Sequence, residues 1–212
     1  MKKLKQMKTI QIIKDNIKNN QKQYILITLI FLVGVLIGVM FINNTQEAQI
    51  EEVKAYITSF IEKMKTTENL DTFSLLKTTL KENILLAIFL WFFGTTVIGI
   101  PIVFGIIFYR GFCLGYSIAA IITTIGTGKG IIFSLITLLL QNIIFIPAII
   151  AIGVSGFNLY KSIVKNKNRE NIKIEVIRHT IFSGIMLLVL CVSAVLEIVV
   201  STNFLKIFVK YF

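Results

Sequence analysis

The sequence is poor in the residues from which enzymes build active sites. Its 212 residues include one histidine, His179, and two cysteines, Cys113 and Cys191, each standing alone in an apolar segment. These residues cannot form a zinc-type ligand set, and no Ser-His-Asp set, HExxH motif or cofactor fingerprint is present. We therefore expect no catalytic, cofactor-binding or metal site, and we interpret both cysteines as small packing residues.

Acidic residues are also scarce. The chain has 11 Asp and Glu against 22 Lys and Arg, a formal net charge of +11. In a soluble protein this balance would suggest a nucleic-acid partner. Here the basic residues flank apolar runs, as membrane topology requires, and no basic groove with interleaved aromatic residues is visible. We expect membrane lipids, and no nucleic acid, as partners.

Charged residues are almost absent from a long apolar stretch in the middle of the chain, on which the predicted fold is based. Residues 84–125 contain one formal charge, Arg110. A membrane span needs about 20 apolar residues, so this stretch is long enough for two. We predict a tight helical hairpin, roughly Ile84–Ile107 and Gly111–Ile125, with Arg110 at a cytoplasmic turn.

The other long apolar runs complete a predicted all-α, polytopic bundle of five transmembrane helices. They cover 24–42, 131–153 and about 180–202. The predicted organisation is a basic tail (1–23), a first span (24–42), an extracytoplasmic loop (43–83), and a four-helix transmembrane part (84–212) that includes a cytoplasmic loop (158–178).

Two polar segments carry amphipathic patterns. Residues 1–23 contain seven lysines and an apolar stripe at helical spacing, which fits either a helix lying on an anionic membrane or a solvated tail. The 43–83 segment contains a second such stripe, so we expect a helix that either binds a partner or covers the bundle. The glycine string at 126–130 lacks the Walker A spacing and predicts a short turn.

Charge distribution predicts the orientation. With five spans, residues 1–23, Arg110 and residues 158–178 share one side and hold most of the basic residues, whereas 43–83 holds seven of the eleven acids. The positive-inside rule then places the amino terminus in the cytoplasm and the carboxyl terminus outside. A four-span alternative puts the two most basic segments on opposite sides and fits less well.

Several residues stand out inside the spans. Gln141, Asn142 and Glu197 are polar groups at membrane depth, where they serve either as a substrate or proton path or as interhelical hydrogen bonds. Arg110 and His179 are expected near the membrane surface. The small or helix-breaking residues expected to serve helix packing or a partner interface are Gly34, Gly38, Gly99, Pro101, Gly111 and Gly115.

The order of these features resembles the stage II sporulation protein M family. The resemblance rests on the lysine-rich tail, one span, the acidic loop, the Gly94…Gly99-Ile-Pro101…Arg110-Gly111-Phe-Cys-Leu-Gly115 hairpin, Gln141-Asn142…Pro147 and Leu196-Glu197. It implies a multi-pass protein of the bacterial cell membrane that acts at the sporulation septum during engulfment. It also implies a non-enzymatic scaffold whose partners are two peptidoglycan-degrading proteins, stage II sporulation proteins P and D.

The residues alone leave another function open. Gln141, Asn142 and Glu197 could line the polar path of a transporter or permease subunit, with the Gly99–Pro101 break interrupting a helix. A five-span chain shows no paired repeats, so transport would need another subunit or a homo-oligomer.

Overall fold

The computed structural model describes residues 18, 20–66, 72–165 and 169–211, and every regular element within these ranges is helical. The elements are α2 (Gln21–Asn43), α3 (Glu47–Thr66), α4 (Thr72–Gly94), α5 (Gly99–Ile125), α6 (Thr127–Ser134), the π-helical turn η1 (Leu135–Leu139), α7 (Leu140–Lys165) and α8 (Arg169–Tyr211). The prediction of an all-α protein is confirmed. Most of the basic tail at 1–23 lies outside the described residues.

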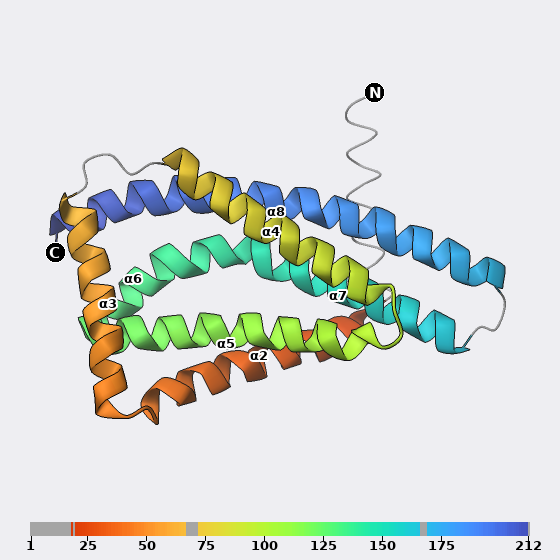
Figure 1. Ribbon diagram of the computed structural model, residues 1–212, viewed down its shortest axis with the longest axis horizontal. Coiled ribbons are helices and arrows are strands. Elements are labelled where there is room, and N and C mark those ends of the chain that lie inside the picture. Colours follow the sequence, from red (N-terminus) through yellow and green to blue (C-terminus); the bar gives the residue numbers. More distant parts are fainter. Residues whose placement is uncertain (1–17, 19, 67–71, 166–168, 212) are drawn as a thin grey trace.

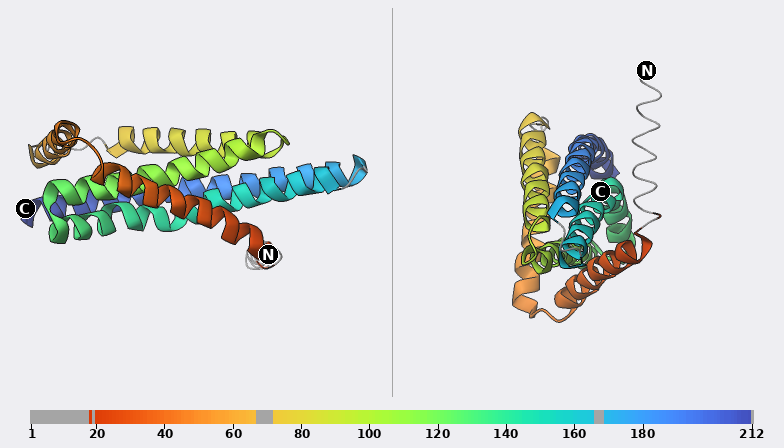
Figure 2. Two further views of the ribbon diagram at one scale, coloured as in Figure 1. Left: turned by 90° about the horizontal axis from the view of Figure 1, so that it is seen from below. Right: turned by 90° about the vertical axis from the view of Figure 1, so that its right-hand side faces the viewer.

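The long helices form an elongated bundle with one helix across its end. α2, α4, α5, α7 and α8 run along the long axis and alternate in direction along the chain (Figure 1). α3 lies across the end at which α2 and α5 finish (Figures 1 and 2). α2 begins at one end of the bundle and α8 finishes at the other.

α7 lies at the centre of this bundle. It contributes the longest series of buried residues, from Ala148 to Gly156. Side chains of α2, α4, α5 and α8 pack around it. The fully buried residues of this core, those of α7 included, are among others Ile27, Leu90, Val103, Ile149, Ile152 and Leu190. The outer faces are apolar as well: Leu36 of α2 is 62% exposed. An apolar interior together with an apolar surface is what a lipid-embedded bundle requires.

Four of the described helices are long and apolar enough to cross a membrane. They are Gln21–Asn43, Gly99–Ile125, Asn142–Val164 of α7 and Ile172–Val199 of α8. The sequence predicted five spans, and the difference concerns α4. The amino-terminal half of α4 carries Lys77, Lys81 and Glu82, while its other half is apolar.

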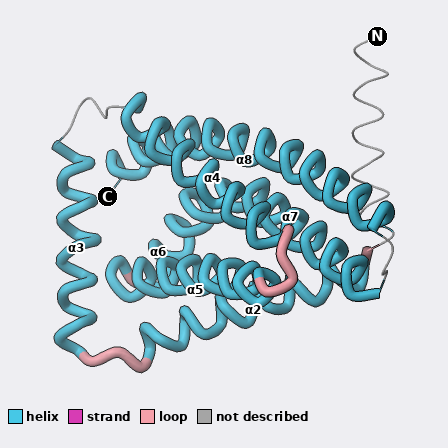
Figure 3. Tube along the Cα trace, turned by 45° about the vertical axis from the view of Figure 1, so that its right-hand side comes forward, coloured by secondary structure: helices cyan, strands magenta, loops and turns pink. Residues whose placement is uncertain are grey.

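The predicted hairpin exists, but its turn was placed wrongly. The chain turns at residues 95–98, between α4 and α5, and Arg110 lies in the middle of the continuous helix α5. Figure 3 shows this connection as a short loop. The Gly99 backbone N–H donates to the Thr96 hydroxyl at 3.0 Å, and a Cβ at position 99 would collide with the Phe93 carbonyl oxygen.

The residues at this turn explain its position. Pro101 is in the first turn of α5, where its missing N–H costs no helical hydrogen bond. Arginine, by contrast, is a good helix former. Arg110 therefore continues the helix, even though it is the only charge in the hairpin stretch.

The polar loops are shorter than predicted because the helices continue past the apolar runs. α4 begins at Thr72, so much of the predicted 43–83 loop is helical. α7 continues to Lys165 and α8 begins at Arg169, so the predicted 158–178 loop is also mostly helix. Lys, Glu, Gln and Arg favour helix, so a helix can extend beyond its apolar part. Hydropathy therefore predicts which part of a helix contacts lipid, but it does not predict the residue at which the helix ends.

The expected amphipathic helix in the 43–83 segment is α3, and it packs on the end of the bundle. Val53 and Ile57 contact a small cluster formed by Ile42, Ala119 and Ala120. The apolar stripe of α3 is thus directed towards α2 and α5. The opposite face of α3 stays exposed.

Four glycines bring α2 and α5 into backbone contact. The two helices run in the same direction, and a Cβ at Gly34 would collide with the Phe108 carbonyl oxygen. The contact is reciprocal, because a Cβ at Gly111 would collide with the Phe31 carbonyl oxygen. Gly38 and Gly115 make equivalent contacts with Phe112 and Val35. Paired small residues four apart allow this close approach in membranes.

These glycine faces are therefore occupied inside the molecule. From the sequence they were expected to serve either helix packing or a partner interface. Because α2 and α5 cover each other here, these four glycines serve helix packing and are not open to a partner.

We predict that Gly34→Ala destabilises the fold, whereas Gly105→Ala does not. The added methyl group at position 34 must push two backbones apart, which costs about 1–3 kcal/mol. Gly105 is in α5, and a methyl group added there would meet no atom within 4 Å, so alanine should be neutral or stabilising by up to about 1 kcal/mol. Thermal unfolding in mild detergent measures both. Equal responses would contradict the close α2–α5 contact.

Candidate functional site

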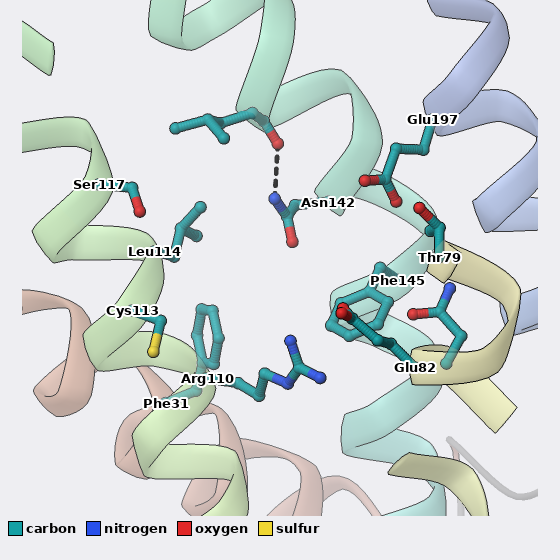
Figure 4. Close-up of a pocket in the computed structure, with 12 residues that line it drawn as sticks. Phe31, Thr79, Glu82, Arg110, Cys113, Leu114, Ser117, Asn142, Phe145 and Glu197 are labelled. Atoms are coloured by element: carbon teal, nitrogen blue, oxygen red, sulfur yellow. Dashed lines mark hydrogen bonds between the residues drawn. The ribbon is translucent and has the colours of Figure 1, made fainter. Parts of the chain in front are cut away.

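A cavity of about 150 Å³ brings three charged side chains together inside the bundle. Glu82 of α4, Arg110 of α5 and Glu197 of α8 line it, along with the polar residues Thr79, Asn83, Ser117 and Asn142. Figure 4 shows the three charged groups directed into a common space from three helices. Phe31 of α2 closes one wall.

The cavity lies about halfway along α2, α4 and α5. Phe31 is two residues from the centre of the uncharged 24–42 run of α2. Arg110 and Glu82 follow and precede the 95–98 turn by similar lengths of helix, which places both about 17 Å from that end. On the other two helices the lining residues stand at the ends of the candidate spans: Asn142 is the first residue of Asn142–Val164, and Glu197 is near the end of Ile172–Val199.

The three charges face one another without forming ion pairs. Among the described residues, neither carboxylate comes within 4 Å of the Arg110 guanidinium, although Glu197 interacts electrostatically with both Arg110 and Glu82. The Arg110 guanidinium carbon lies 5.5 Å from the centre of the Phe145 ring, a cation–π contact. The guanidinium is thus held against α7 while its N–H groups remain directed towards the cavity.

An irregular turn shapes the wall formed by α7. The π-helical turn η1 precedes α7, and Leu138 from this turn lines the cavity. The Asn142 side-chain N–H donates to the Leu138 carbonyl at 2.6 Å, so the amide oxygen is left free to face the cavity (Figure 4). Such π turns are frequent at functional sites.

A second polar cluster ties α4, α7 and α8 together near the 95–98 turn. The His179 Nδ1 lies 2.9 Å from the Ser155 hydroxyl oxygen, and its Nε2 lies 3.3 Å from the Trp91 carbonyl oxygen. The Trp91 indole N–H donates to the Thr180 hydroxyl at 3.1 Å. His179 is 1% exposed, so its ring is buried between the helices, and its predicted place near the membrane surface stays a prediction.

Backbone contact makes this burial possible. Gly94 and Gly156 lie against each other, and a Cβ at Gly94 would come within 2.9 Å of the His179 Nε2 atom. The ring therefore occupies the space left by the missing side chain of Gly94. Its hydrogen bonds to a hydroxyl and a carbonyl make it a structural link among three helices.

Most of the chain matches a known protein family. The family model described as stage II sporulation protein M matches residues 27–202. The chain belongs to the stage II sporulation protein M family. The match extends from α2 far into α8 and includes every charged residue of the cavity. No curated protein and no solved structure matches the chain.

Membership in the stage II sporulation protein M family confirms the resemblance predicted from the sequence. Together with the apolar helices, it identifies a membrane protein related to sporulation. Within the part of the chain that the structure describes, no three His, Cys, Asp or Glu side chains converge to hold a metal ion.

The structure unites some of the predicted polar residues and adds others. Asn142 and Glu197 line the same cavity, as does Arg110, which was predicted to lie at a surface turn. The side chain of Gln141 lies outside the described residues, so its suggested bond to the Glu197 helix stays a prediction. Glu82 and Asn83 were missed, because both fall in the segment that was predicted to be a loop.

Asn83 supplies a direct link between α4 and α8. It is 5% exposed, and its side-chain N–H donates to the Leu190 carbonyl at 3.1 Å. This bond fixes the register of the two helices beside the cavity. The sequence contained a signal for these two residues. Glu82 and Asn83 directly precede the apolar run that starts at residue 84, and a helix that begins before this run includes them.

We predict that Arg110→Met lowers stability and that adding Glu197→Gln restores part of it. Removing the guanidinium leaves the half-buried Glu197 and the exposed Glu82 facing the same cavity without a fixed positive charge between them, at a cost of roughly 1–3 kcal/mol, and neutralising Glu197 relieves the imbalance. Thermal unfolding of single and double variants measures this coupling. Lys22→Met, at an exposed lysine of α2, is the control and should have little effect. Additive changes in the double variant would contradict the interaction.

Proposed function

We propose that this protein is a non-enzymatic membrane scaffold that recruits peptidoglycan-degrading partners at the septal membrane during engulfment. Family membership supports this role, because the resemblance implies stage II sporulation proteins P and D as partners. The structural observation that carries the proposal is α3, a helix that packs across one end of the bundle and exposes its other face.

The proposed topology has five spans, with the amino terminus in the cytoplasm and the carboxyl terminus outside. It requires α4 to cross the membrane together with the four more apolar helices. Residues 1–23 contain seven lysines and residues 158–178 contain six basic residues. The described parts of these segments lie at the end of the bundle where α2 begins (Figure 1). The positive-inside rule assigns that end to the cytoplasm, and α3 then faces the cell-wall side.

The exposed face of α3 has the composition of a docking surface. Glu51, Glu52 and Tyr56 are exposed, and Tyr56 has 74% of its surface accessible. Tyrosine is enriched in protein interfaces, because a rigid ring offers a large contact area and a hydroxyl group. We infer that a partner with a basic surface binds this acidic and aromatic patch.

Capture from detergent-solubilised membranes tests the scaffold. Tagged wild-type protein should recover membrane-anchored wall hydrolases, and a Glu51→Gln, Glu52→Gln, Tyr56→Ala variant should recover at least tenfold less of them, since loss of an interface anchor costs about 2 kcal/mol or more. Tyr109→Ala, which removes another exposed tyrosine on α5, is the matched control. Equal recovery by the patch variant, or wild-type protein that purifies alone, would refute the proposal.

The cavity favours a second candidate, a transporter or permease subunit. Asn142 and Glu197 were expected to line a polar path, and they share the cavity with Arg110 and Glu82. An interrupted helix beside such a site is a feature of transporters, and η1 interrupts the helix that leads into α7.

Uptake of sodium or protons into proteoliposomes tests this candidate. If the cavity is part of a path, Glu197→Gln should abolish uptake while the protein stays folded. Glu51→Gln on α3, which removes an exposed carboxylate outside the cavity, should leave uptake unchanged. Uptake equal to that of protein-free vesicles would eliminate the transporter.

A further inference from the structure

The charges that line the central cavity do not cancel. Glu82 and Glu197 supply two carboxylates and Arg110 supplies one guanidinium, so the ionised cluster has an excess of one negative charge. The three groups are separated by the cavity and are not paired directly. The space between them can therefore hold another positive group.

The surroundings make this excess charge costly. The apolar side chains of Phe31, Leu114, Leu138 and Phe145 line the same cavity as the charged groups, and an uncompensated charge held against apolar groups costs free energy. A bound monovalent cation would make the cluster neutral. A divalent cation would instead leave an excess positive charge, so charge balance favours the monovalent ion.

The groups lining the cavity are suited to a hard cation. Besides the two carboxylates, the Asn142 amide oxygen and the Thr79 hydroxyl line the same space. Oxygen atoms of carboxylates, amides and hydroxyls are the ligands of hard cations. A volume of about 150 Å³ has room for one small cation and a few waters, each of which takes about 30 Å³ in the liquid.

We propose that this cavity is a sodium-binding site, with Glu82 and Glu197 as its charged ligands and Asn142 and Thr79 as neutral ones. Arg110, held against Phe145, balances the second carboxylate. The site goes beyond the scaffold role and does not depend on it, since a bound ion can stabilise the bundle whether or not ions cross the membrane.

Sodium-dependent unfolding of the purified full-length protein tests the site. Binding stabilises the folded state by mass action, so replacing choline chloride with sodium chloride at constant pH and ionic strength should raise the midpoint of thermal unfolding. A sodium concentration 100-fold above Kd corresponds to a rise of about 5–10 °C. Magnesium chloride at the same ionic strength should give a smaller rise.

Matched Glu→Gln variants locate the effect. Glu82→Gln and Glu197→Gln each remove the excess charge and a ligand, so each should lose the sodium-dependent rise. Because glutamine is neutral and of similar size, both should be at least as stable as wild type in choline chloride. Glu47→Gln, at an exposed position on α3 outside the docking patch, should keep the full response.

Calorimetric titration of sodium chloride into the protein supplies a second readout that does not require unfolding. Heat of binding that is present in wild type and in Glu47→Gln but absent from the two cavity variants would support the site. A midpoint that is equal in sodium and choline and varies only with pH would overturn it in favour of simple protonation. A sodium response retained by both cavity variants would also overturn it. Neither result would affect partner capture through α3.

Discussion

The close contact between α2 and α5 determines how the interior is arranged. Gly111 and Gly115 face α2, so the rotation of α5 about its own axis is fixed. Successive residues are displaced by about 100° around a helix, and Arg110 is therefore turned away from α2 and towards Phe145 of α7. The charge points into the bundle instead of into lipid. Without this contact, α5 could rotate and the cavity would lose its positive wall.

Much of the fold follows from apolar composition, but the ends of the helices do not. The long uncharged runs correctly identified an all-helical membrane protein. The turn at 95–98 was misplaced because Arg110 was the only charge in its stretch, and a charge is a natural marker for a membrane surface. Gly99 and Pro101 were the better signal, since they act on the backbone itself. Polar residues at the run ends were assigned to loops, although most of them favour helix.

The candidate site was predictable only where a polar residue interrupted an apolar run. Asn142 and Glu197 were found in this way. Glu82 stands just before such a run, so only the continuous helix α4 places it beside Arg110 and Glu197 in the cavity. The partners of His179 were not predictable either: it follows a basic residue, and nothing in the local sequence indicates that a hydroxyl from α7 and a carbonyl from α4 lie within hydrogen-bond distance of its ring. These contacts join distant segments, and spacing along one chain does not encode them.

The charged cavity and the exposed α3 surface both depend on one helix, α5, and this links them mechanically. α3 packs on Ala119 and Ala120 of α5, only about 14 Å along that helix from Arg110. Lipid offers helices little reason to choose one neighbour over another, so the register of α5 depends on its glycine contact with α2 and on the charges it faces. A group that neutralises the cavity therefore stabilises the position of α5, and with it the platform on which α3 rests. In a scaffold, the rigidity of a partner surface on α3 would then depend in part on the charge balance in the cavity.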